Sequence, residues 1–131
     1  MKHGKEITIG IYGRNYPRDD WHYPIDRTAL ENFLADLSVE LAPFGIQVAS
    51  RFEENIILEI KGYGDLLNSV RLRSPQDSIS NLCLGHVIGS SLNRDLFEDI
   101  RRGVTRIAFA PETVEPEGSS KVVCHNCGCG C

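Results

Sequence analysis

Hydrophobic and polar positions change their period several times along the first 60 residues of the chain. Residues 7–12 alternate between β-branched and small side chains, which is the two-residue period of a strand. A polar loop follows, and then apolar side chains recur every three or four residues, as on one face of a helix. Asp26 is placed to cap this helix, and Pro43 and Gly45 end it. The helical stripe consists of Ala29, Leu30, Phe33, Leu34, Leu37 and Leu41.

The segment after this helix predicts a pair of strands. Residues 46–52 alternate between apolar and polar side chains, and residues 56–60 form a second, mostly apolar run. Only the polar residues 53–55 separate the two runs. Because a connection this short joins antiparallel neighbours, the pattern predicts a hairpin.

A second helical region and a last strand complete the pattern. Ser and Pro at 74–75 are typical of a helix start, and apolar side chains within residues 79–87 share one helical face. Asn93 is placed to start a further helical piece, which Gly103 is expected to end. Residues 104–109 alternate and predict the final strand.

The predicted order is therefore strand–helix–strand–strand–helix–strand, an α+β fold. This order resembles the split βαβ pattern of ferredoxin-like sandwiches, which implies one four-stranded antiparallel sheet with both helices on one face. A thioredoxin-like arrangement is the alternative, since it also opens with strand–helix–strand and has a late helix. That arrangement would normally insert a helix between the second and third strands, where this sequence predicts a turn. Either resemblance concerns architecture and supplies no function.

Composition predicts one globular domain at residues 1–110. The chain has 131 residues, of which 41% are hydrophobic and 24% charged, both close to globular norms. Residues 111–120 contain two prolines, three glutamates, two serines and one glycine, which predicts a flexible linker to a tail at residues 121–131.

Charge and hydropathy narrow the expected partners and compartment. A net charge of -4 gives no reason to expect a nucleic-acid partner. No apolar run approaches the roughly 20 residues that span a bilayer, and the N-terminus carries no signal-peptide pattern. We therefore expect a cytoplasmic protein without a membrane partner. In that reducing compartment, clustered cysteines favour metal binding or catalysis over disulfides.

The tail carries the strongest chemical signal in the sequence. Four of the five cysteines, Cys124, Cys127, Cys129 and Cys131, form a Cys-x-x-Cys-x-Cys-x-Cys run, with His125 as an auxiliary ligand. Thiolates are the ligands that copper(I) and zinc prefer. The two Cys-x-Cys steps resemble metallothionein segments, where neighbouring thiols share soft ions. This pattern predicts a metal-binding, cysteine-rich tail.

The spacing also indicates how such a metal would be held. A structural zinc site usually takes two ligand pairs from separate elements, whereas these ligands are nearly consecutive and would be cramped around one tetrahedral ion. A labile, low-coordination ion such as copper(I) is favoured. The sequence thus predicts a metallochaperone-like protein that exchanges a soft ion with another protein. An iron–sulfur cluster shared between two chains is a further option.

Two other interpretations of the tail stay open. In the first, Cys129 and Cys131 form an easily reduced disulfide, and the protein is a dithiol relay or oxidoreductase whose partner is an electron donor or acceptor. Against this, few positive charges lie nearby to activate a thiolate. In the second, the chain is a precursor whose cysteine-rich tail is post-translationally modified.

The remaining polar signals are weaker. Cys83 and His86 are three residues apart, but their apolar neighbours favour core packing over metal binding. Asp19, Asp20 and His22 suggest a carboxylate–imidazole site. The loop of residues 14–23 is also the best docking surface on the domain, because long loops often carry function. The competing and favoured interpretation is a loop anchored by its aromatic residues, which are Tyr16, Trp21 and Tyr23.

Overall fold

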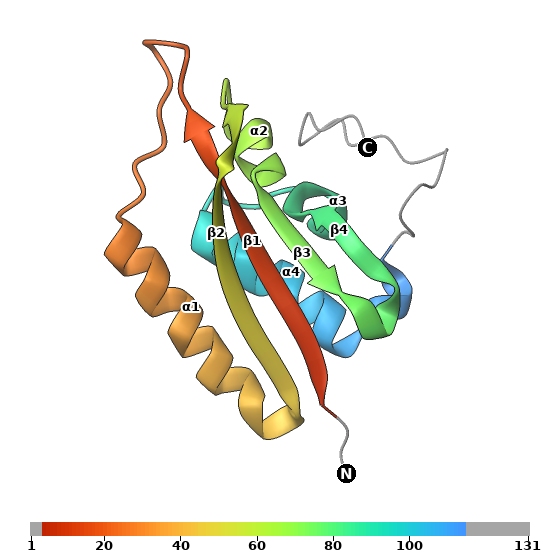
Figure 1. Ribbon diagram of the computed structural model, residues 1–131. Helices are drawn as coiled ribbons and strands as arrows, with labels where there is room; N and C mark the ends of the chain where they lie inside the picture. The colour runs from red at the N-terminus through yellow and green to blue at the C-terminus, as the bar shows by residue number, and fades with distance from the viewer. Residues whose placement is uncertain (1–3, 115–131) are drawn as a thin grey trace.

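The computed structural model describes residues 4–114, which form an α+β domain with one mixed four-stranded sheet. Figure 1 shows the strands in the spatial order β2-β1-β3-β4. Strands β1 and β2 run parallel, whereas β3 is antiparallel to both β1 and β4. The strands are β1 (Lys5–Asn15), β2 (Ile46–Glu59), β3 (Val70–Ser74) and β4 (Ile79–Cys83).

Four α-helices occur within the described residues, and the two longest lie side by side against the sheet. Phe33 of the first helix stacks on Phe97 of the last, with ring centroids 4.8 Å apart, so these two helices cover the same face. The helices are α1 (Arg27–Leu41), α2 (Tyr63–Asn68), α3 (Leu84–Ile88) and α4 (Leu96–Phe109). Short 3-10 helices occupy Ala42–Phe44, Pro75–Asp77 and Pro111–Thr113.

The core lies between this helical layer and one face of the sheet. Ile7, Ile9 and Ile11 of β1 are at most 1% exposed, as the alternation along that strand predicts. Val70 and Leu72 of β3 are fully buried beside them. Apolar stripes of α1 and α4 close the core, and they include Leu30, Leu34, Leu37, Leu41, Leu96, Ile100, Val104 and Ile107.

The predicted hairpin at residues 46–60 is wrong, because this segment is one strand. The pairing with β1 passes from Tyr12–Glu53 directly to Gly13–Ile57, so the residues between Glu53 and Ile57 bulge out of the ladder. Gly13 allows the bulge, since a Cβ atom there would lie 3.0 Å from the carbonyl oxygen of Glu54. The polar residues that suggest a turn therefore interrupt a strand without reversing it.

The predicted second helix and final strand are also wrong. Pro75–Asp77 form only a 3-10 helix, and Ile79–Cys83 continue as strand β4 before α3 begins. Gly103 does not end a helix but lies in the middle of α4. A Cβ at that position would lie 2.5 Å from Leu84 Cδ1, so the glycine serves the close packing of α4 on α3. The alternating pattern after it belongs to an amphipathic helix.

These corrections change the sheet. The ferredoxin-like topology is not confirmed, because the β1–α1–β2 unit produces a parallel pair where an antiparallel sheet is predicted. Helix α2 also stands between β2 and β3, where the ferredoxin-like order has only a turn. The first strand and the first helix are confirmed, including the cap of α1, in which the Asp26 side chain accepts from the Thr28 amide.

The described chain ends just inside the predicted linker. The 3-10 helix Pro111–Thr113 is held by Arg106, whose Nη2 donates to the Thr113 carbonyl oxygen at 2.7 Å. Val114 packs against the core. The rest of the linker and the tail lie outside the described residues, so the division at residues 110 and 120 stays a prediction. Within residues 4–114, no helix is long and apolar enough to cross a membrane.

Candidate functional site

The predicted thiolate site lies entirely outside the residues that the structure describes. It comprises Cys124, Cys127, Cys129 and Cys131 with His125. Within residues 4–114, no three His, Cys, Asp or Glu side chains come together as a metal site. The metal-binding prediction therefore rests on the sequence of the tail.

Cys83 and His86 occupy the junction between β4 and α3. Cys83 is 1% exposed and belongs to the hydrophobic core, as the core-packing interpretation predicts. Its Sγ atom accepts from the backbone amide of His86 at 3.4 Å and so caps the N-terminus of α3. The thiol has a structural role there.

The loop between β1 and α1 is held by its aromatic side chains. The Tyr16 hydroxyl donates to the Tyr23 carbonyl oxygen at 3.1 Å, and the Tyr16 ring packs against Trp21 and His22 at centroid distances of 6.1 and 4.9 Å. The Tyr23 hydroxyl in turn accepts from the amide of Leu96, at the start of α4. The interpretation of an aromatically anchored loop is therefore confirmed.

The two aspartates of this loop do not join His22 in a common site. Asp20 pairs with Arg18 through two hydrogen bonds of 2.9 and 2.6 Å, and Asp19 is exposed. The described residues contain no hydrogen bond or ion pair between His22 and either aspartate. The carboxylate–imidazole site is thus not formed. The Arg18 hydrogen bonds lower the pKa of Asp20, which keeps this carboxylate ionised.

A small pocket lies beneath the same loop, at the end of β1. Its volume is about 260 Å³, and its position matches the general rule that ligands bind beyond the carboxyl ends of parallel strands. Figure 1 shows the loop leaving the tip of β1 beside β2. The pocket is lined by Tyr12, Gly13, Arg14, Tyr16, His22, Tyr23, Ile25 and Glu54.

Arg14 gives this pocket its chemical character. The Nη1 atom of its guanidinium group is buried and has no hydrogen-bond acceptor among the described residues. A buried donor without an acceptor costs about 1–3 kcal/mol, and more when it carries charge, so such groups are rare in native proteins. Arg14 therefore supplies an unused cationic donor at the wall of a cavity.

Two groups that line the pocket, Tyr16 and Glu54, set the electrostatic surroundings of Arg14. Burial raises the pKa of the Tyr16 hydroxyl, and the nearby Arg14 guanidinium acts in the opposite direction. Tyr16 therefore stays neutral near pH 7. Glu54 also lines the pocket, but its carboxylate is engaged by Arg27 Nη1 at 2.9 Å. The Tyr16 hydroxyl is a hydrogen-bond partner of the Arg14 side chain, but an acceptor for the Arg14 Nη1 atom would have to come from outside the described residues.

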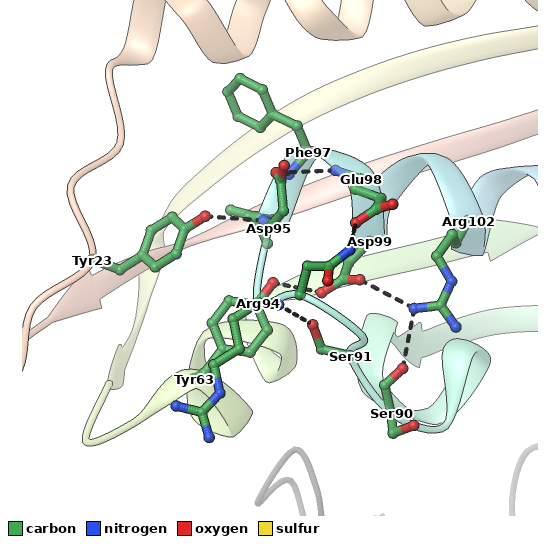
Figure 2. A network of polar contacts seen from close by, with 12 residues as sticks. Tyr23, Tyr63, Ser90, Ser91, Arg94, Asp95, Phe97, Glu98, Asp99 and Arg102 are labelled. Atoms are coloured by element: carbon green, nitrogen blue, oxygen red, sulfur yellow. Dashed lines mark hydrogen bonds and ion pairs between the residues drawn. The ribbon is translucent and has the colours of Figure 1, made fainter.

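A second buried polar cluster, centred on Asp99 of α4, is fully partnered. The Tyr63 hydroxyl donates to Asp99 Oδ2 at 2.5 Å, and Arg102 Nη1 contacts Oδ1 at 3.2 Å. Figure 2 shows both contacts as dashed lines. The same Arg102 atom donates to the Ser90 carbonyl oxygen at 3.1 Å. Burial, and then the hydrogen bond to the Asp99 carboxylate, raises the pKa of Tyr63 far above its ordinary value.

The cluster around Asp99 joins three elements through a carboxylate that is 0% exposed. Tyr63 comes from α2, Ser90 from the connection after α3, and Asp99 with Arg102 from α4. Each oxygen of the buried Asp99 carboxylate has a partner within the domain. Its chemistry is structural: it fixes α2 against α4.

Sequence reasoning does not identify Arg14 or Asp99 as special. A weak signal exists for Asp99, since it lies between Leu96 and Ile100 on the apolar side of α4. For Arg14 the signal is only its position near the end of a buried strand. Which atom of an arginine lacks a partner depends on tertiary packing.

The chain was compared with protein-family models, curated proteins and solved structures, and none of the three comparisons found a match.

Proposed function

We propose that this protein binds a soft metal ion, copper(I) or zinc, through its C-terminal thiolates and transfers it to or from another protein. The observation that carries the proposal is the placement of Cys124, Cys127, Cys129 and Cys131 within eight consecutive residues. Thiolates at this density repel one another, and a soft cation removes the repulsion. His125 adds a borderline ligand within the same run.

The folded domain is consistent with a metal site that belongs to the tail alone. Its core is closed by hydrophobic packing within residues 4–114, and its single cysteine there, Cys83, is a buried cap of α3. Folding of the domain therefore needs no thiolate ligand from the tail. We expect the domain to serve partner recognition, with the loop of residues 14–23 as the docking surface, in a cytoplasmic setting.

A dithiol relay that uses Cys129 and Cys131 is the second candidate, and the observation that raises it is the topology of the sheet. The domain opens with a parallel β1–α1–β2 unit, inserts α2 before β3, and pairs β3 with β4 antiparallel. The inserted helix is the feature expected of a thioredoxin-like arrangement. This likeness is architectural, and the first loop contains no cysteine, so thiol exchange would have to occur in the tail.

The test of metal binding is an anaerobic titration of the reduced full-length chain with copper(I) in competition with a coloured chelator. We expect the chain to withdraw copper from the chelator, with release of protons from the thiols. A variant with all four tail cysteines replaced by serine should lose this ability. The matched control is Cys83→Ala, which leaves the tail intact and should bind as the unmodified chain does.

The same samples separate transfer from relay. A relay predicts a defined two-electron reduction potential, and either Cys129→Ser or Cys131→Ser should abolish thiol–disulfide exchange completely. Metal binding predicts a graded loss as single thiolates are removed. If the four-serine variant competes for copper as well as the unmodified chain, the metal proposal is wrong. If mass spectrometry shows modified tail cysteines, the chain is a precursor.

A further inference from the structure

We propose that the pocket at the end of β1, formed around Arg14, Tyr16 and Tyr23, binds the oxyanion group of a small molecule. The oxyanion is a carboxylate or a phosphate, since a guanidinium group recognises both with the same fork of N–H donors. This proposal concerns the folded domain and is independent of the metal-binding tail.

The first argument is the state of Arg14 itself. Its Nη1 atom is buried without a hydrogen-bond acceptor in the described part of the chain. By contrast, the other half-buried arginines have acceptors: Arg73 binds Glu53 at 2.7 and 3.1 Å, and Arg102 binds Asp99. Proteins satisfy buried donors, and a ligand oxygen is the acceptor that would satisfy this one.

The second argument is the selection of groups around the cavity. Tyr16 and Tyr23 place hydroxyl-bearing side chains at the pocket, and His22 adds an imidazole at the wall. The one carboxylate at the pocket, that of Glu54, is paired with Arg27 at 2.9 Å. Arg27 also pairs with Glu31 at 3.1 Å, so the Glu54 charge is only partly offset, and the preference for an anion rests on the buried guanidinium of Arg14.

The third argument is location and size. The pocket lies at the carboxyl end of β1, which is parallel to β2, and this edge is where α/β sheets hold their ligands. Drug-sized molecules occupy sites of about 300–1,000 Å³, so a cavity of about 260 Å³ suits something smaller. A benzoate-sized carboxylate or a small phosphate meets this limit.

The chain contains its own reporter for the test. Trp21 is the only tryptophan, and its ring centroid lies 6.1 Å from that of Tyr16 at the pocket. We would titrate the full-length protein separately with sodium benzoate and with inorganic phosphate at constant ionic strength. Trp21 fluorescence gives the affinity, and backbone amide NMR shifts locate the site. Saturable binding with shifts confined to residues 12–25 is the expected result.

Variants of two arginines make the test specific. Arg14→Gln should weaken binding at least about tenfold, because it removes a charge-assisted pair of hydrogen bonds. Arg18→Gln is the matched control: Arg18 lies four residues further along the chain, pairs with Asp20 on the surface and does not line the pocket, so binding should change less than about twofold. Arg14→Lys and Tyr16→Phe provide the same comparison if Arg14→Gln does not fold.

Each result of these anion titrations either supports or overturns the proposed site. Tighter binding of benzoate identifies a carboxylate ligand, and tighter binding of phosphate identifies a phosphorylated one; both support the site. The proposal is overturned if neither anion saturates the protein by about 10 mM, the weak end of specific affinities. It is also overturned if Arg14→Gln, or its substitutes, binds as well as the Arg18→Gln control. The copper titration of the tail is unaffected in every case.

Discussion

Asp99 and Arg14 are both charged residues with buried atoms, yet the protein treats them in opposite ways. Asp99 is 0% exposed, and each of its carboxylate oxygens has a partner, from Tyr63 on one side and Arg102 on the other. Arg14 has a buried Nη1 atom for which the described residues offer no acceptor. One aromatic contact links the surroundings of the two groups. Tyr23, which lines the pocket of Arg14, packs against Tyr63, which binds Asp99, with ring centroids 5.7 Å apart.

The difference teaches how to separate a structural polar group from a binding one. A buried charge with all its partners holds elements together and has nothing left to offer a ligand. A buried donor without an acceptor is a cost that folding alone does not explain. We therefore assign Asp99 to the stability of the domain and Arg14 to its binding chemistry.

The sharpest way to break this comparison is to remove the Asp99 carboxylate. Asp99→Ala leaves Tyr63 and Arg102 without their buried acceptor, and we expect a loss of about 3 kcal/mol in the free energy of unfolding. Urea denaturation followed by circular dichroism measures it. Asp99→Asn, which keeps the shape and one acceptor, should lose less. A loss below about 0.5 kcal/mol for the alanine variant would show that the network is not structural.

Removing the phenol of Tyr63 tests the other side of the same contact. Tyr63→Phe should cost about 1–2 kcal/mol, since Asp99 keeps Arg102. The folded-state pKa of Tyr63 is raised, so its contribution is fully present below pH 10 and is lost as the pH rises above that value. The unmodified protein should therefore lose more stability in alkali than the variant. Equal alkaline losses would contradict this assignment.

Replacing Arg14 should change the stability of the protein in the opposite direction from replacing Asp99. Arg14→Met keeps the length of the side chain and removes the unpartnered donor, so stability should be unchanged or should increase by up to about 1 kcal/mol. Thermal unfolding without added anions checks this prediction. A clear destabilisation would mean that Arg14 has structural partners and would remove the contrast with Asp99. Addition of phosphate or benzoate should then stabilise the unmodified protein more than the variant.

A half-buried ion pair on the open face of the sheet should contribute less to stability than the buried contacts of Asp99. Glu53 binds Arg73 at 2.7 and 3.1 Å, and these hydrogen bonds lower the pKa of Glu53. A lowered carboxyl pKa adds stability at neutral pH, which is lost as the pH falls through the folded-state value. Glu53→Gln should thus cost no more than about 1 kcal/mol at pH 7. The difference from the unmodified protein should shrink in acid; a constant difference would point to packing instead.

The sequence predicts those elements of the fold that neighbouring residues determine, and it misses those that distant contacts determine. The stripe of α1 and its Asp26 cap are set by neighbours in the chain, and both are confirmed. By contrast, Gly103 resembles a helix terminator but lies inside α4, where Leu84 packs too closely for a side chain. The polar residues before Ile57 resemble a turn but form a bulge. In each case a contact with a residue far along the chain decides the outcome.

The candidate sites show the same limit. Aromatic anchoring of the loop at Tyr16 follows from composition, whereas the missing acceptor of Arg14 follows from packing that no local pattern records. Cys83 is predicted as a core residue and is confirmed as one. The thiolates of the tail differ from Arg14, because residue type and spacing alone predict their metal-binding chemistry. They stay a prediction, because they lie outside the described residues.

The most direct test of the proposed function is the metal content of the full-length chain after anaerobic purification, measured together with its thermal unfolding. We predict about one or more equivalents of copper or zinc, which the four-serine tail variant lacks. Both proteins should unfold at nearly the same temperature, because residues 4–114 close the core by themselves. A metal-free chain with four reactive tail thiols, or equal metal in the variant, would contradict the account.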